Sequence, residues 1–348
     1  MKYSELYWND IESAITCIPQ VEALYGKNIL ITGGTGMICS AVADVLLWLN
    51  RHRNAGIQLY LAGRSEAKTK ARFEGFTEAD GLHFAAYDAT TSEPPAVSEK
   101  LDYIIHGASN ASPDLYMKQP VETMLSNILG LNTMLDFAVK NGTGRLLYVS
   151  SSEVYGRKTT MDPFDEGDYG YVDILGERSG YPSAKRAGET LCVAYGMEHG
   201  TDTVIVRPGH IYGPTIQPSD KRASAEFTRK AVAGEDIVMK SKGEQLRSYC
   251  HTLDCATALL TVLLKGERST AYNISNPISI CTIREIAEAI ARAGGVKIVF
   301  DLPSEAEAKS YNPMNNSSLR SDRLEALGWK PYFNLESGVE SMIKVLKA

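Results

Sequence analysis

Short apolar runs alternate with longer segments of helical periodicity over residues 28–207 of this 348-residue chain. Glycine or small polar residues follow most of the runs, as is typical of buried strands that end in a turn. The predicted strands lie at residues 28–31, 58–61, 83–86, 103–106, 145–149 and 204–206. Their continuous apolar character indicates strands that are covered on both faces.

The segments between these strands have the spacing of amphipathic helices. Residues 127–141 place Ile128, Leu131 and Leu135 on one side of a helix that closes at Gly142. Strand and helix therefore alternate along the chain. This alternation predicts a doubly wound α/β fold, in which a parallel Rossmann sheet has helices on both faces.

Both ends of the chain carry further helical patterns. In residues 1–26 the apolar positions recur near helical spacing before a glycine, which predicts an amphipathic helix that covers or pairs with another surface. Thr282 and Glu285 form a capping box that opens a later helix. Residues 334–346 have the pattern of a closing helix.

These patterns divide the chain into three parts. Residues 1–26 form an N-terminal helical extension, and residues 27–208 form a dinucleotide-binding Rossmann domain. In residues 209–348 the alternation loosens, which predicts a smaller, mixed substrate-binding lobe that can return strands or helices to the first domain. Within this lobe, residues 303–318 are rich in proline, serine and asparagine and form the predicted mobile loop.

Composition narrows the classes of function. With 44% hydrophobic and 22% charged residues and no apolar run of about 18 residues, we expect a soluble globular protein without a membrane span. The formal net charge of -6 argues against nucleic acid as a partner. The start of the chain shows no secretory pattern, so we expect a cytoplasmic protein. Six scattered cysteines predict reduced thiols and no metal site.

A glycine-rich turn links the first strand to the next helix. The turn is Thr32-Gly33-Gly34-Thr35-Gly36, and an apolar helix follows it directly. Gly33 and Gly36 let the backbone turn tightly and approach a pyrophosphate, whose negative charge is stabilised at a helix N-terminus. Cys39 stands where a third glycine is usual, and its side chain is small enough to be tolerated. The turn therefore predicts a dinucleotide cofactor, NAD or NADP.

Residues after the next strands bear on the choice of cofactor. An NAD site usually has a carboxylate after the second strand, whereas this chain has Arg64, which can meet a 2′-phosphate or stack on adenine. NADP is therefore permitted, with an ordinary surface arginine as the alternative. Asp88 follows the third strand, where it can accept a hydrogen bond from an adenine amino group. Ala108 and Ser109 are small enough for a backbone close to a cofactor.

A tyrosine and a lysine four positions apart form the candidate catalytic pair. Tyr181 and Lys185 lie on the same face of a predicted helix. A free phenol has a pKa near 10, which is too high for a base at neutral pH. The lysine ammonium is expected to favour the phenolate form of the tyrosine. A solvated helix face can show the same spacing, so the pair gains its meaning from the motifs around it.

Together these motifs resemble the extended short-chain dehydrogenase/reductase family, the NAD-dependent epimerases, dehydratases and decarboxylases of nucleotide sugars. The likeness covers essentially the whole chain after residue 27. It rests on the cofactor turn, the catalytic strand end, the base motif and the start of the substrate lobe, at residues 32–36, 148–156, 181–185 and 207–214. The resemblance implies a nucleotide-diphosphate sugar as substrate. It also implies a homodimer joined through the helix around residues 115–141 and the Tyr181 helix.

The resemblance implies a role for each residue at the catalytic strand end. Tyr181 is expected to take the proton of the sugar C4 hydroxyl, and Ser151 to hydrogen-bond the same hydroxyl. Family 4,6-dehydratases carry an Asp-Glu pair where this chain has Ser152 and Glu153, so simple dehydration is disfavoured. Glu153 is then a candidate for orienting the sugar or relaying a proton.

Within the family the likeness is to UDP-glucuronate decarboxylases. Residues 106–113 and 151–156 look like two of their signature stretches. Residues 243–249 are similar to the segment that carries their substrate-binding arginine, here Arg247. The chain departs from them at Ser151, where they usually have threonine, and at Arg64, where an acid is expected.

Further contacts follow from the same resemblance. Substrate contacts are expected from Ser152, Asn110 and Arg247, whereas Lys221 and Arg222 are interpreted as solvated loop residues. Cofactor contacts are expected from Gly33, Thr35, Gly36, Met37, Ile38, Arg64, Asp88, Ala108, Ser109, Asn127 and Lys185.

Three alternatives stay open. A nucleotide-sugar 4-epimerase acts through the same transient C4 oxidation. An NADPH-dependent ketosugar reductase suits Arg64 and consumes its cofactor, whereas an epimerase or a decarboxylase recycles it. A catalytically silent binding protein on the same fold is the third alternative. The joint presence of Ser151, Tyr181 and Lys185 argues against it.

Overall fold

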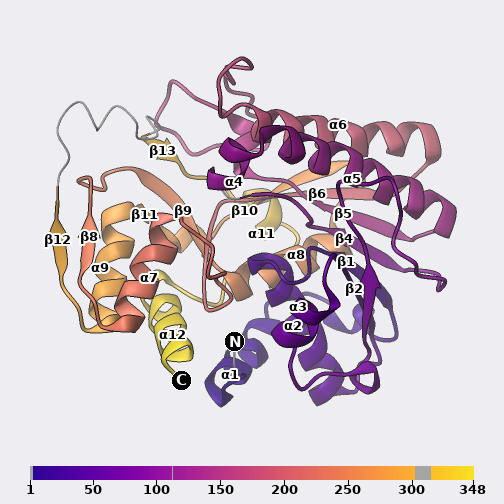
Figure 1. Cartoon of the computed structure of the whole chain (residues 1–348), viewed down its shortest axis with the longest axis horizontal. Coiled ribbons are helices and arrows are strands. Elements are labelled where there is room, and N and C mark those ends of the chain that lie inside the picture. The colour runs from indigo at the N-terminus through magenta and orange to yellow at the C-terminus, as the bar shows by residue number, and fades with distance from the viewer. Residues whose placement is uncertain (1–2, 112, 302–314) are drawn as a thin grey trace.

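The computed structural model describes residues 3–111, 113–301 and 315–348, and its centre is a parallel sheet of seven strands (Figure 1). The strand order is β10-β6-β5-β4-β1-β2-β3, with every neighbouring pair parallel. The strands are β1 (Asn28–Thr32), β2 (Gln58–Gly63), β3 (Leu82–Ala86), β4 (Tyr103–His106), β5 (Arg145–Val149), β6 (Thr203–Pro208) and β10 (Thr270–Ile274). The predicted α/β fold with a doubly wound sheet is confirmed.

Helices cover both faces of this sheet. They are the long helices α2 (Met37–Arg53), α5 (Pro120–Asn141), α6 (Gly180–His199) and α8 (Thr252–Lys265) and the short helices α3 (Glu66–Arg72) and α4 (Pro113–Lys118). Ile29 and Ile31 of β1 pack in the core formed with α2 and α8, whereas Leu30 packs in the core formed with α5 and α6. Because successive side chains point to opposite faces, both kinds of position must be apolar.

The sheet reverses its strand order between β1 and β4. β2 and β3 lie on one side of β1, while β4, β5, β6 and β10 lie on the other. The connections after β1 and β4 therefore lead in opposite directions. This leaves a crevice at the carboxyl ends of these strands, where ligands of doubly wound sheets bind.

Residues after β6 build a smaller unit beside the sheet (Figure 1). β9 is its central strand, paired in parallel with β7 and β13 and antiparallel with β11, and β8 forms a separate parallel pair with β12. Its elements are β7 (His210–Tyr212), α7 (Ala223–Ala233), β8 (Ile237–Met239), β9 (Leu246–His251), β11 (Ile280–Thr282), α9 (Ile283–Gly294), β12 (Ile298–Phe300), β13 (Asn316–Ser317) and α12 (Leu335–Lys347). In contrast, α8, β10 and α11 (Asp322–Glu325) return to the large sheet.

Two helices have limits that differ from the prediction. In the N-terminal extension, α1 (Glu5–Ile15) ends early, and a 3-10 turn over Val21–Leu24 follows. Pro19 lies between them and cannot donate the backbone hydrogen bond that would continue the helix. α5 begins at Pro120 rather than near Asn127, because a proline at the first helical position loses no intrahelical bond.

The predicted helix starts in the smaller unit are confirmed. The side chain of Thr282 caps α9, and Glu285 completes the capping box. Asn334 caps α12, the predicted closing helix. These signals are local, because a cap needs only residues within one helical turn.

A buried polar cluster binds the N-terminal helix α1 to the sheet domain. Asp44 of α2 is completely buried and accepts hydrogen bonds from Tyr3 Oη (2.7 Å) and Tyr7 Oη (2.8 Å). Arg72 Nη2 lies 2.5 Å from Asp44 Oδ2 and supplies the opposite charge. The helix also packs against α8 and α12, so it contacts both parts of the chain and covers them, as predicted.

Other features bear on the predictions from composition. Each of the six cysteines is a free thiol, and five of them are buried. Within the described ranges, no helix is both long enough and apolar enough to cross a bilayer. Of the loop predicted over residues 303–318, residues 303–314 lie outside the described residues, whereas Asn316–Ser317 form β13, a strand paired with β9.

We expect Asp44→Asn to lower the free energy of unfolding by about 3–5 kcal/mol, because Arg72 is then buried without a counter-charge. Denaturant unfolding measures the loss. The matched control is Glu12→Gln on the exposed side of α1, which we expect to change stability by less than about 0.5 kcal/mol. Equal stability of Asp44→Asn and the wild type would show that the cluster does not hold the extension.

Candidate active site

A cavity of about 540 Å³ opens at the carboxyl ends of β1, β4, β5 and β6, between the large sheet and the smaller unit. Many predicted site residues line it: Gly33, Gly36, Met37, Ile38, Ser109, Asn110, Ser151, Ser152, Glu153, Tyr181, Lys185 and Arg247. The predicted residues that lie outside this lining are Thr35, Arg64, Asp88, Ala108 and Asn127. The fold therefore places the glycine-rich turn and the candidate base, Tyr181, around the same cavity.

The turn after β1 packs closely against the turn after β4. Gly33 has a φ of +70°, and a Cβ there would lie 3.0 Å from the backbone of Ala108. Thr32 Oγ1 accepts hydrogen bonds from the backbone N–H groups of Gly107 and Ala108, both at 3.1 Å. A Cβ on Gly107 would overlap Cys39 Sγ. The cysteine at the third glycine position is therefore accommodated because its neighbour has no side chain.

These features fit the pyrophosphate of a dinucleotide. α2 begins directly after Gly36, and the first N–H groups of its 17 residues have no acceptor within the helix. Met37 and Ile38 of this first turn line the cavity. Within the described structure, Ser109 Oγ and Asn127 Oδ1 are buried without a hydrogen-bond partner. Ser109 lines the cavity, so its hydroxyl suits a polar ligand such as NAD or NADP, whereas Asn127 lies outside the lining.

The carboxyl ends of β2 and β3 carry one cation and one carboxylate. Arg64 follows β2 with an exposed side chain. Asp88 follows β3 and accepts hydrogen bonds from Thr90 N (3.0 Å) and Thr90 Oγ1 (2.8 Å). These bonds, and to a lesser degree the charge of Arg64, hold the pKa of Asp88 below its usual value. The β2 end thus offers a cation where NAD sites usually offer an acid.

Tyr181, Lys185 and Ser151 meet where α6 crosses the end of β5. Tyr181 and Lys185 are only 6% and 2% exposed. Lys185 Nζ donates a hydrogen bond to Val149 O at 2.8 Å and lies 5.8 Å from the centre of the Tyr181 ring. Ser151 ends the strand, and its hydroxyl caps the short 3-10 helix Ser152–Tyr155. The arrangement has the residue types that a buried phenol base requires.

Burial acts on the pKa of both members of this pair. Burial raises the pKa of Tyr181 above its usual value, although the Ser151 hydroxyl acts to lower it. Burial also lowers the pKa of Lys185 to about 7. Desolvation, which residue spacing does not reveal, disfavours the charged form of both side chains. Burial thus opposes the effect that the lysine charge is expected to have on the phenol.

The cavity that Tyr181 lines also contains the carboxylate of Glu153 and the guanidinium groups of Arg178 and Arg247. Desolvation raises the pKa of Glu153, while the positive charges of Arg178 and Arg247 act to lower it. Arg247 belongs to β9 and is 5% exposed. Arg178 precedes α6, and its Nη2 donates to Tyr116 Oη at 3.1 Å. The Tyr116 ring stacks on the Tyr181 ring, with centroids 5.3 Å apart.

Two of these residues, Tyr116 and Arg178, are absent from the sequence prediction although they line the cavity. Arg178 stands just before the Tyr181 helix, and its place beside a motif was the only signal that could have drawn attention to it. No local pattern connects Tyr116 with Tyr181. Their stacking depends on how separate segments of the chain pack.

Arg222 also differs from its prediction as a solvated loop residue. It lines the cavity, and its Nη2 lies 2.5 Å from Asp220 Oδ2. Its loop reaches the N-terminal turn of α2, where Thr215 Oγ1 donates to Met37 O at 2.8 Å. Lys221 does not line the cavity.

The comparisons with known proteins agree with this arrangement. The chain matches the NAD dependent epimerase/dehydratase family over residues 29–275. It is 32% identical to UDP-glucuronic acid decarboxylase 6 of Arabidopsis thaliana over 323 residues, which cover 90% of this chain and 87% of that protein. It is also 32% identical to UDP-glucuronic acid decarboxylase 1 of Danio rerio over 320 residues, 91% of this chain and 72% of that protein.

Solved structures with a similar fold include the UDP-glucose 4-epimerase of Thermotoga maritima with UDP-glucose. Its TM-score is 0.76 at 22% identity, over 91% of this chain and 98% of that chain. Another is the dTDP-glucose 4,6-dehydratase of Bacillus anthracis in complex with NAD, with a TM-score of 0.75 at 19% identity, over 92% of this chain and 96% of that chain. At these identities the likeness shows the fold alone.

We expect Arg64→Asp to weaken binding of NADP at least about tenfold, a loss of about 1.4 kcal/mol, because a carboxylate repels the 2′-phosphate. Binding of NAD should be unchanged or tighter, since a carboxylate can accept from both ribose hydroxyls. Calorimetric titration with each cofactor measures the two affinities. Arg292→Asp, an equal charge change at an exposed position of α9, is the control. Equal weakening of both cofactors by Arg64→Asp would contradict the prediction.

Proposed function

The chain belongs to the NAD dependent epimerase/dehydratase family, and on this premise we propose that it removes carbon dioxide from a nucleotide-linked hexuronic acid. UDP-glucuronic acid is the substrate to test first, because the relatives described above are named for it. The observation that carries the proposal is that Glu153, Arg178 and Arg247 line the same cavity as Tyr181, with both guanidinium charges acting on Glu153.

The first step of the proposed reaction is oxidation of the sugar at C4. Tyr181 is the proposed base for the C4 hydroxyl proton, and Ser151 is proposed to hold that hydroxyl by a hydrogen bond. Lys185, anchored on Val149 O, holds a positive charge near the phenol when it is protonated. NAD supplies the hydride acceptor when it is bound, together with a positive ring that favours the phenolate.

The second step is loss of carbon dioxide. With a ketone at C4, the C6 carboxylate belongs to a β-keto acid, and the electrons of the breaking C5–C6 bond pass to the C4 oxygen. The chain then needs to hold the carboxylate and to deliver a proton to C5. Arg178 and Arg247 suit the first task, because guanidinium groups pair bidentately with carboxylates. Glu153, with its raised pKa, suits the second.

Position 152 supports decarboxylation over dehydration. Dehydration at C6 needs an acid to protonate the departing hydroxyl, and Ser152 cannot supply it at neutral pH. A net NADPH-dependent reduction of a ketosugar is the second candidate, favoured by Arg64 at the end of β2. The two candidates differ in their use of cofactor, because a decarboxylase returns the hydride to its product, whereas a reductase consumes NADPH.

We further propose a homodimer with two-fold symmetry, formed through α5 and α6. Val121, Leu125 and Leu129 follow one another at four-residue spacing on α5 and are 62%, 44% and 39% exposed. Met197 of α6 is 84% exposed, and the two helices pack side by side. An apolar surface of this kind favours association with a second copy. A cytoplasmic location stays a prediction from sequence.

We expect incubation with UDP-glucuronic acid and NAD to give a product lighter by about 44 mass units, the mass of the carbon dioxide lost from a β-keto acid. Mass spectrometry detects it, with a panel of other UDP-, dTDP-, CDP- and GDP-sugars run alongside. Tyr181→Phe should lower turnover about 10²–10⁴-fold, because the base is removed. Tyr169→Phe, at a position that is 80% exposed, is the matched control.

Other outcomes of this experiment would replace the proposed reaction. A product of unchanged mass and new retention time would indicate epimerisation. Stoichiometric loss of NADPH with a ketosugar would indicate the reductase. Full turnover by Tyr181→Phe would show that Tyr181 is not the base.

We expect light scattering to give about twice the chain mass of 38.0 kDa for the wild type. The double variant Leu125→Glu/Leu129→Glu should give the monomer mass, because two charges per subunit would be buried in the proposed interface. Ile278→Glu, at an apolar residue that is 63% exposed elsewhere, is the control and should stay dimeric. A wild-type monomer at all concentrations would contradict the proposed dimer.

A further inference from the structure

The helix that carries Tyr181 and Lys185 has a third polar residue at the same spacing. Glu189 follows Lys185 by four positions, so the three side chains lie along one face of α6. They meet consecutive residues at the end of β5. Lys185 Nζ donates to Val149 O at 2.8 Å, and Ser150 Oγ donates to Glu189 Oε1 at 2.6 Å. Ser151, the next residue, lies beside Tyr181.

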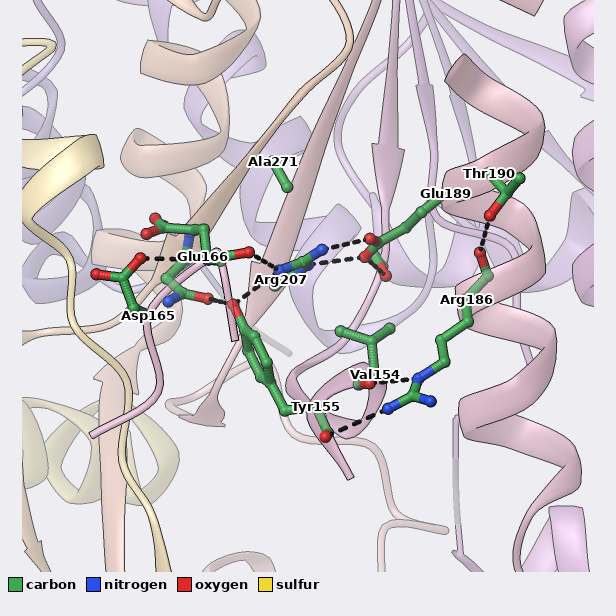
Figure 2. A network of polar contacts seen from close by, with 12 residues as sticks. Val154, Tyr155, Asp165, Glu166, Arg186, Glu189, Thr190, Arg207 and Ala271 are labelled. Carbon is green, nitrogen blue, oxygen red and sulfur yellow. Dashed lines mark hydrogen bonds and ion pairs between the residues drawn. The ribbon is translucent and has the colours of Figure 1, made fainter. Parts of the chain in front are cut away.

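Arg207, in β6, fixes the carboxylate of Glu189 (Figure 2). Its Nε donates to Glu189 Oε1 at 2.9 Å and its Nη2 to Glu189 Oε2 at 2.6 Å. The remaining nitrogen, Nη1, donates to Tyr155 Oη at 3.0 Å and to Glu166 O at 2.9 Å. The Arg207 and Glu189 side chains are only 5% and 12% exposed. Because each nitrogen of the fork has an acceptor, neither side chain is free to rotate.

This network holds Ser151 from both sides. Ser150 precedes it and is bound to Glu189, while Tyr155 ends the 3-10 helix that Ser151 caps and is bound to Arg207. The pair thus joins the strand end, the catalytic helix and β6. A site built this way fixes its hydroxyl by packing and hydrogen bonds on both sides, which keeps the reacting geometry constant.

Glu189 also sets the charge near Lys185. Its negative charge acts to raise the pKa of Lys185, against burial. The other groups that face the amine are the Tyr148 and Tyr181 rings, Cys39, Cys192 and His106. Burial raises the pKa of both thiols and lowers the pKa of His106 to about 3, so these three are neutral at pH 7. Arg207 places a positive charge 2.6 Å from the Glu189 carboxylate.

We propose that Glu189, clamped by Arg207, is a positioning residue of this site. Through Ser150 it fixes Ser151 relative to Tyr181, and its charge favours the protonated form of Lys185. The inference rests on the proposed function, since it takes Tyr181 as the base. Glu189 does not line the cavity, so it acts on the site only through its contacts with Ser150 and Arg207 and through its charge.

The charge is tested with Glu189→Gln, which keeps an oxygen acceptor for Ser150 but removes the negative charge. The 13C signal of Lys185 Cε in lysine-labelled protein, assigned with Lys185→Met, reports its titration. We expect the pKa of Lys185 to fall by at least about one unit, and the high-pH limb of turnover to move down equally. Turnover at pH 8 should then fall at least tenfold and recover toward pH 6. Glu198→Gln, at a side chain that is 77% exposed on the same helix, should change neither measurement.

An unchanged Lys185 titration in folded Glu189→Gln would overturn the role of the charge, as would an equal loss of turnover at every pH. Should the unpaired Arg207 prevent folding, Glu189→Gln/Arg207→Gln removes both charges and is held to the same criteria. The titration needs no substrate. A wild type that does not decarboxylate UDP-glucuronic acid would therefore refute the proposed reaction, while the titration still decides the role of Glu189.

The positional role is tested separately with Ser150→Ala. This variant leaves both charges in place and removes only the hydrogen bond to the strand end. We expect kcat to fall at least tenfold at every pH, with the Lys185 titration and the KM for the sugar within about twofold of wild type. Unchanged kcat would overturn the positional role.

Discussion

Burial of charge at the end of β5 is the constraint on which the proposed active site depends. Lys185 is almost completely enclosed, and its one backbone acceptor, Val149 O, does not compensate for lost water. Its pKa is accordingly lowered to about 7 by burial. The site must therefore supply charge from the protein and from its cofactor rather than from solvent. The close packing of α6 on the strand end gives the geometry, and the same packing imposes the electrostatic cost.

Two buried ion pairs accommodate enclosed charges in this chain. One is Asp44 and Arg72 at the N-terminal extension, and the other is Glu189 and Arg207 beside the active site. Each pair is also hydrogen-bonded to at least one tyrosine hydroxyl. Buried pairs of this kind add little net stability, but removing one partner is costly. The first pair attaches a helix. The second pair joins the end of β5, α6 and β6 around Ser151, so its main effect is to fix the geometry of the site.

The cavity combines groups from separate parts of the fold. Glu153 belongs to the end of β5, Arg178 precedes α6, and Arg247 comes from β9 in the smaller unit. The proposed carboxylate site is therefore complete only where the sheet and the smaller unit face one another. The loop that carries Arg222 contacts Met37 at the start of α2. This contact joins the parts of the cavity that are proposed to hold substrate and cofactor.

The sequence by itself determined the strands, the glycine turn, the helix caps and the Tyr181–Lys185 pair. These are local features, because buried strands show as apolar runs and helical neighbours as fixed spacings. Only the tertiary structure decided that Tyr116 stacks on Tyr181, that Arg178 and Arg247 face Glu153, and that Arg207 clamps Glu189. It also showed that burial raises the pKa of the phenol, against the effect expected of the lysine charge. Residue spacing reveals neither contacts between distant segments nor the loss of solvent around a side chain, because both depend on how the whole chain packs.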